Sequence, residues 1–93
     1  MDNIDNSGKT LQQYPCDYQF KVFGQVVADD DFMARVHAAV NCVTVVPLDA
    51  CKQRPSSKGG YVCVSVAAYL HNEQQRQDIY RQLQQLEGLK YLL

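Results

Sequence analysis

Apolar and polar side chains alternate along two stretches of this chain, and a period of two predicts strands. The first stretch runs from Tyr18 to Gly24, where Tyr18, Phe20 and Val22 share one side. The second runs from Tyr61 to Leu70 and is the clearer of the two. One of its faces carries Val62, Val64, Val66, Ala68 and Leu70, and the other carries Tyr61, Cys63, Ser65, Ala67 and Tyr69. We therefore predict two strands that each turn one apolar face to the core.

In the segment after each of these strands, apolar residues recur every three to four positions, which is the period of a helix. We predict that a first helix begins near Asp29 or Asp30, because acidic side chains cap free backbone amides and favour the positive helix end. Asn72, with Gln75 three residues later, forms a capping-box pattern for a second helix, whose glutamines and arginines should face water. The predicted buried stripes are Phe32, Val36, Ala39, Val40 and Val43 in the first helix and Ile79, Tyr80, Leu83 and Leu86 in the second.

Two shorter segments complete the predicted order of elements. Leu48 to Arg54 has room for one strand, which Pro47 confines to an edge. Gly88 suits the end of the second helix, and Leu89 to Leu93 forms a short last strand. The order is β-α-β-β-α-β, and right-handed crossovers favour one arrangement for it. We predict an α+β, ferredoxin-like sandwich: a four-stranded antiparallel sheet with two helices on one face.

Length and charge restrict the kinds of function. The 93 residues fit one small domain, residues 14–93, after a polar leader, residues 1–13, that we expect to be disordered. The net charge of -1 gives no overall attraction to nucleic acid or to an anionic membrane. The leader lacks the pattern of a signal peptide, and no segment reaches the roughly 20 apolar residues of a membrane-spanning helix. We expect a cytoplasmic protein without membrane contact.

The residues that most often carry catalysis or hold metals are widely spaced. The four cysteines form no Cys-x-x-Cys pair, and only His37 and His71 supply imidazoles, so we expect reduced thiols and neither metal nor other cofactor. A redox-sensing role for the cysteines stays an alternative. Neither histidine lies in a nucleophile motif, so we predict no catalytic activity. The acidic run Asp29 to Asp31 could bind a divalent cation, but helix capping explains it better.

One face of the predicted sheet stays uncovered and carries aromatic side chains. Phe23, Tyr61 and Tyr69 give this face an apolar strip larger than a small monomer usually exposes. We predict that these three rings form an interface with a second copy, in a homodimer, or with a partner protein.

RNA binding through the same face is an alternative, because RNA-binding sheets of this topology place aromatic rings on their two central strands. Aligned on Lys58 and Gly59, however, the RNA-binding signature has aromatic residues where this chain has Gly60, Val62 and Ser65. The near-neutral charge also supplies no phosphate-binding footprint. We therefore expect no nucleic-acid partner.

The loop between the two middle strands is the most unusual part of the chain. Ser56, Ser57, Lys58, Gly59 and Gly60 offer two hydroxyls, one ammonium group and glycine amides that can point at one anion. A small anionic metabolite carrying a phosphate or carboxylate could bind there. The alternative is a plain polar hairpin loop with a solvated lysine. The spacing is not that of a P-loop.

Several segments together resemble the YbeD-like family of small bacterial proteins. The resemblance runs from about Tyr14 to the C-terminus, and the Pro-Ser-Ser-Lys-Gly segment at the hairpin is its most specific part. The segments are Tyr14-Pro15, Lys21-Val22-Phe23-Gly24, Pro55-Ser56-Ser57-Lys58-Gly59, Tyr61, Val64-Ser65-Val66, His71 and the tail from Tyr80 to Leu93.

The resemblance implies a ferredoxin-like fold similar to ACT-type regulatory domains. In those domains the loop after the first strand receives a small ligand, which implies that Gly24 and Gln25 contact a ligand here. The alternative is that Gly24 only permits the turn from strand to helix. We therefore predict a non-catalytic binding or regulatory module that contacts a small ligand or a protein partner. An RNA-binding module and an accessory protein of a metabolic enzyme are the alternatives.

Overall fold

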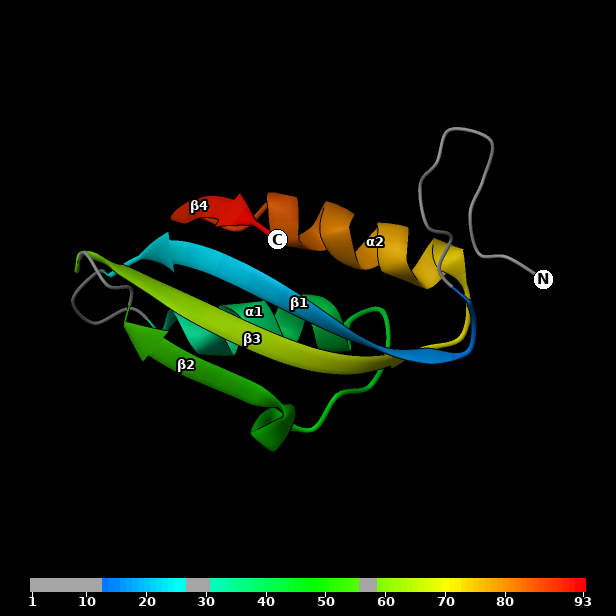
Figure 1. Ribbon diagram of the computed structural model, residues 1–93. Coiled ribbons are helices and arrows are strands. Elements are labelled where there is room, and N and C mark those ends of the chain that lie inside the picture. Colours follow the sequence, from blue (N-terminus) through cyan, green and yellow to red (C-terminus); the bar gives the residue numbers. More distant parts are fainter. Residues whose placement is uncertain (1–12, 27–30, 56–58) are drawn as a thin grey trace.

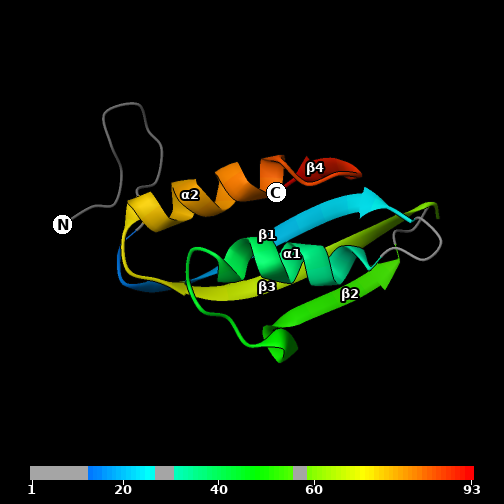
Figure 2. The ribbon, with the colours of Figure 1, turned by 180° about the vertical axis from the view of Figure 1, so that it is seen from behind.

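Four strands form one antiparallel sheet, and both helices lie against the same face of it (Figures 1 and 2). The structure is a computed structural model, and it describes residues 13–26, 31–55 and 59–93. Most of the predicted leader therefore lies outside the described residues. Figure 1 looks onto the sheet face that the helices leave uncovered, and Figure 2 shows the helices in front. The predicted two-layer architecture is confirmed.

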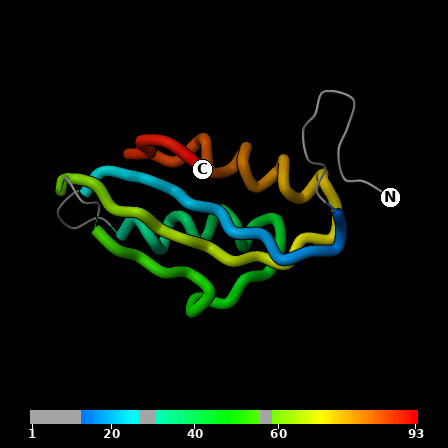
Figure 3. The backbone as a smooth tube through the Cα atoms, in the orientation of Figure 1, coloured from blue at the N-terminus to red at the C-terminus, as the bar shows by residue number. Residues whose placement is uncertain are grey.

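The strands occur in the order β2-β3-β1-β4 across the sheet. Their bounds are β1 (Cys16–Gln25), β2 (Cys51–Pro55), β3 (Tyr61–Leu70) and β4 (Leu89–Leu92). The two long strands lie side by side in the middle (Figure 3), with Cys16 opposite Leu70 at one end and Gln25 opposite Tyr61 at the other. The short strands β2 and β4 form the two edges. This is the predicted ferredoxin-like order.

The bounds of three strands differ from the prediction: β1 begins at Cys16 rather than Tyr18, β2 ends at Pro55 rather than Arg54, and β4 ends at Leu92 rather than Leu93. The first strand continues past Gly24 and ends at Gln25, because residue 24 still pairs with both neighbouring strands. The segment predicted as one strand from Leu48 is divided between a short 3-10 helix, η1 (Leu48–Ala50), and β2. The backbone amide of Ala50 donates to the carbonyl of Pro47 at 3.0 Å, which closes this turn before the strand begins.

Both helices begin at a side-chain cap. Helix α1 (Phe32–Asn41) is capped by Asp31, whose Oδ1 accepts from the amide of Ala34 at 3.1 Å. The helix thus begins later than predicted, and Asp29 and Asp30 lie outside the described residues. In α2 (Glu73–Gln84) the predicted cap, Asn72, accepts from the amide of Gln75 at 2.8 Å. The Gln75 side chain accepts from the amide of His71 rather than from that of Asn72, so the reciprocal contact lies one residue earlier than in a standard capping box.

The core lies between the sheet and the two helices. From the sheet, Phe20, Val22, Val64, Val66 and Leu70 are fully buried, and from the helices Val36, Val40, Ile79 and Leu83 are fully buried. The predicted inner face of Tyr61 to Leu70 is therefore confirmed. Of the predicted helical stripes, Ala39, Val43, Tyr80 and Leu86 are only partly buried and border this core. Val43 lies beyond the end of α1.

Candidate binding face

The sheet face opposite the helices carries one row of side chains from all four strands. Strand register places Arg54 of β2 opposite Cys63 of β3, Cys63 opposite Phe23 of β1, and Phe23 opposite Tyr91 of β4. Side chains alternate between faces along a strand, so the neighbouring outward positions belong to the same surface. We call this surface the open face and define it by Asp17, Gln19, Lys21, Phe23, Gln25, Lys52, Arg54, Tyr61, Cys63, Ser65, Ala67, Tyr69 and Tyr91.

Aromatic rings cover one end of the open face. The rings of Phe23 and Tyr91 stack, with 4.4 Å between centroids and 14° between planes. The Lys90 ammonium lies 5.5 Å from the centre of the Tyr61 ring. Tyr69 is far from these rings, because the eight residue steps from Tyr61 to Tyr69 along β3 span about 26 Å. Of the three predicted interface rings, the structure brings Phe23 and Tyr61 to one end and leaves Tyr69 at the other.

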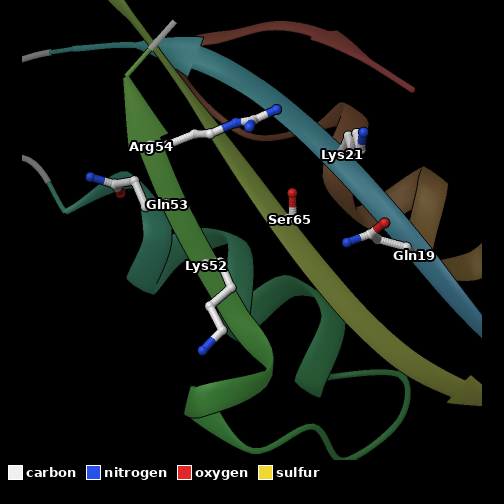
Figure 4. Close-up of a pocket in the computed structure, with 6 residues that line it drawn as sticks. All are labelled: Gln19, Lys21, Lys52, Gln53, Arg54 and Ser65. Atoms are coloured by element: carbon white, nitrogen blue, oxygen red, sulfur yellow. The ribbon is translucent and has the colours of Figure 1, made fainter.

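Three cations surround a hollow in the middle of the open face. Lys52 of β2 lies opposite Ser65 of β3, and Ser65 lies opposite Lys21 of β1. The hollow has a volume of about 300 Å³, and Figure 4 shows the Arg54 side chain extending from β2 across β3 toward β1. Within residues 13–26, 31–55 and 59–93, none of these three cations forms an ion pair; the pairs are Arg76 with Glu73 and Arg81 with Asp78.

The predicted ligand-binding residues are only partly described by the structure. Ser56, Ser57 and Lys58 lie outside the described residues, while Gly59 and Gly60 have φ of 69° and 75°, which favours glycine. The amide of Val26 donates to the carbonyl of Gly60 at 3.0 Å. The end of β1 and the end of this loop therefore lie together, as a shared site would require. Ligand binding there stays a prediction.

Gly24 has a packing role that its place in the sequence does not reveal. A Cβ atom at this position would lie 2.3 Å from Cζ of Phe32, whose ring packs directly on the strand. The register between β1 and β4 also shifts between Phe23 and Gly24. The predicted alternative, a glycine that permits the turn, is therefore replaced by a glycine that makes room for a ring of α1. Contact of Gly24 and Gln25 with a ligand stays a prediction.

A polar cluster joins the beginning of β1 to the beginning of α2. Glu73 accepts from the Tyr14 hydroxyl at 2.6 Å and pairs with Arg76 at 2.6 Å. The Arg76 guanidinium lies over the rings of Tyr18 and Tyr80, whose hydroxyls are 3.0 Å apart. Arg76 is therefore half-buried and does not face water as predicted, because these rings cover its side chain. The cluster ties the two elements together.

The charges of this cluster are set by hydrogen bonds and burial. The hydrogen bond from Arg76, with a second one from Tyr14, lowers the pKa of Glu73 to about 2. Burial, together with the contact to Glu73, raises the pKa of Tyr14 to about 12. Burial and the Tyr18 hydroxyl raise the pKa of Tyr80 to about 12. None of these three groups changes charge near neutral pH, which indicates a structural role.

We expect Glu73→Gln to lower the free energy of unfolding at pH 6 and to have less effect at pH 2. Because folding lowers the pKa of Glu73 from 4.5 to about 2, its contribution is present above pH 4.5 and is lost as the pH falls toward 2. The Glu73 side chain is 42% exposed, so solvent screens the pair and we expect about 1 kcal/mol or less. Urea unfolding at pH 6 and pH 2 checks this, with Glu87→Gln as the control. A difference between wild type and Glu73→Gln that is the same at both pH values would contradict it.

Both histidines contact a neighbouring residue, and two of the four cysteines are buried. His37 Nε2 lies 2.6 Å from the carbonyl oxygen of Val46, and the His71 ring packs edge-on against Tyr69 at 5.4 Å. Cys51 and Cys63 are buried, and burial raises the pKa of the Cys51 thiol. Among the described residues no three His, Cys, Asp or Glu side chains are grouped to hold a metal ion, and neither helix could span a membrane.

The fold defines a small ferredoxin-like α+β module with an uncovered sheet face. The chain belongs to the family described as Protein of unknown function (DUF493), whose model matches residues 9–93. A UPF0250 protein of Shewanella piezotolerans is 34% identical over 91 residues, covering 97% of this chain and 99% of that protein. A UPF0250 protein of Idiomarina loihiensis is 34% identical over 84 residues, covering 89% of this chain and 91% of that protein. The resemblance to the YbeD-like family is thereby confirmed.

A solved structure has the same fold. The solution structure of protein HP0495 from H. pylori matches with a TM-score of 0.67 and covers 95% of this chain and 91% of its own. Its sequence is 20% identical to this chain, so the likeness concerns the fold alone.

Proposed function

We propose that this protein is a non-catalytic binding and regulatory module that holds an acidic partner protein against its open face. One observation carries the proposal: the open face combines stacked rings at one end with cations that have no acidic partner among the described residues. Rings and arginine are the side chains that most often anchor a protein interface. Here Arg54, Phe23 and Tyr91 lie in one row across the sheet.

The distribution of charge favours an acidic partner. The chain as a whole has a net charge of -1, yet the centre of the open face is basic. On the open face the acidic side chain Asp17 lies at the end of β1 opposite Tyr69, away from these cations, while Glu73 and Asp78 lie on α2, on the other side of the sheet. An acidic surface that approaches the centre of the open face therefore meets three cations that form no ion pair among the described residues, and this complementarity orients the encounter.

The same features make the other occupants less suitable. An RNA-binding sheet uses rings at adjacent positions of its two central strands, whereas Phe23 here lies opposite Cys63. Two copies paired about a two-fold axis through this face would bring Lys21, Lys52 and Arg54 of both chains together, so like charges would meet. Homodimer formation stays a prediction and is one outcome of the test below. The proposal also places the protein in the cytoplasm, where reduced thiols such as Cys51 and Cys63 are the rule.

Charge reversal on the open face is expected to abolish partner binding. Tagged wild type, the double variant Lys21→Glu/Arg54→Glu and the control Arg81→Glu, whose side chain is 60% exposed on α2, are incubated with extract of the producing cells. Like charges in an interface cost several kcal/mol, so we expect a loss of at least about 100-fold in affinity for the double variant. Wild type and Arg81→Glu should retain the same acidic protein.

The retained protein is then purified and mixed with labelled wild type. Amide shifts confined to the open face complete the test. Retention that is the same in all three proteins, or shifts that fall on α1 and α2, would contradict the proposal. Recovery of untagged copies of this chain alone would favour the homodimer instead.

A further inference from the structure

We infer that the hollow between β1, β2 and β3 binds the phosphate group of a small metabolite. This goes beyond the proposed partner binding, because a small ligand fills the hollow without any protein partner. Six residues from three strands line it: Gln19, Lys21, Lys52, Gln53, Arg54 and Ser65. Three of them are cations, Gln19 and Ser65 can donate hydrogen bonds, and none is acidic. The side chain of Gln53 points away from Ser65 in Figure 4.

Strand register builds the centre of this site. Lys52, Ser65 and Lys21 lie in one line across three neighbouring strands. Because neighbouring strands are about 4.8 Å apart, the two lysine Cα atoms lie roughly 10 Å apart, one on each side of the serine hydroxyl. A group placed over Ser65 is therefore within reach of both ammonium groups. The sheet holds the three Cα positions rigidly, which a loop of the same composition would not do.

The side chains around Ser65 approach the hollow from both sides. In Figure 4, the Gln19 amide extends from β1 toward Ser65, and Arg54 reaches across β3 from β2. The Lys52 ammonium points away from Ser65 in the same view. Lys52 is exposed and can rotate over a ligand, at the usual entropic cost of ordering one long side chain. Arg54 and Gln19 thus provide the preformed part of the site, and Lys52 closes it.

The charge of the site selects the class of ligand. A phosphate monoester carries about -1.5 to -2 at neutral pH and presents three strong acceptor oxygens. Guanidinium and ammonium groups together match such a group, because arginine donates in a fork and lysine acts as a point charge. A single carboxylate would leave most of these three cations without a partner. The volume of about 300 Å³ accepts a phosphate with a small organic remainder.

The test is an amide chemical-shift titration of the labelled full chain. The probes are inorganic phosphate and glycerol 3-phosphate, added at constant ionic strength, with glycerol and sodium chloride as controls. We expect saturable shifts at Lys21, Lys52, Arg54 and Ser65 with both phosphates and with neither control. Lys21→Gln removes a charge-assisted contact and should weaken phosphate binding about tenfold.

Lys90→Gln is the matched control, because it removes the same charge from beside Tyr61, outside the hollow. Screening by salt should limit its effect to about twofold. An equal loss of phosphate affinity in both variants would overturn the inference. It would show that phosphate responds to the overall positive charge of the surface rather than to a site in the hollow. A response to inorganic phosphate but not to glycerol 3-phosphate would also overturn it. No partner protein is added, so this outcome and that of the extract experiment are independent.

Discussion

Gly24→Ala is expected to destabilise the fold by about 2 to 3 kcal/mol, although it adds a single methyl group. The added carbon would lie between 2.3 and 2.7 Å from three atoms of the Phe32 ring. That ring is 3% exposed and cannot move into solvent without opening the core. Urea unfolding of the two proteins gives the difference in the free energy of unfolding.

A second substitution identifies the cause of this loss. Phe32→Leu removes the ring atoms that the new methyl group would meet, so it should cost much less in the Gly24→Ala background than in the wild type. We expect a coupling free energy of about 1 kcal/mol or more in the double-mutant cycle. Strictly additive losses would contradict the contact. If Gly24→Ala alone left the stability unchanged, the packing role of Gly24 would be wrong, and only its predicted contact with a ligand would remain.

Leu83→Ala is expected to cost about 2 to 5 kcal/mol, because this side chain of α2 is fully buried against the sheet. Leu93→Ala is the matched control, since it deletes the same atoms from a side chain that is 63% exposed. We expect the control to change the free energy of unfolding by less than about 0.5 kcal/mol. The two variants compare the same deletion at a buried position, Leu83, and at an exposed position, Leu93. Equal losses would show that Leu93 is buried in solution and that another element or a second copy covers it.

The sequence predicts the fold well because each long element carries a complete local pattern. In the ten residues from Tyr61 to Leu70 every second position is valine, alanine or leucine, and Asn72 with Gln75 indicates the start of α2. Boundaries were less predictable where two signals compete. Three consecutive aspartates offered three possible caps for α1, and among the described residues Asp31 forms the cap. Before β2, the chain forms the turn at η1 rather than a longer strand, because the amide of Ala50 donates a hydrogen bond to the carbonyl of Pro47.

The features that could not be predicted depend on contacts between distant segments. The hollow requires the register of three strands, and no spacing within one strand brings Lys21 and Lys52 to the same serine. Tyr91 was not predicted to stack on Phe23, because β4 is too short for alternation to assign its faces. The contact between Tyr14 and Glu73 spans 59 positions. In each case the residue types were visible in the sequence, but their neighbours were not.

Site-specific photocrosslinking in the producing cells shows whether an acidic protein binds to the open face. A photoreactive phenylalanine analogue replaces Tyr91 on the open face in one protein and Arg81 on the exposed side of α2 in another. We expect a discrete adduct with one acidic protein from position 91 and none from position 81. The adduct should be lost when Lys21→Glu and Arg54→Glu are introduced. Adducts that form only from position 81, or that survive both charge reversals, would contradict the open face as the binding surface.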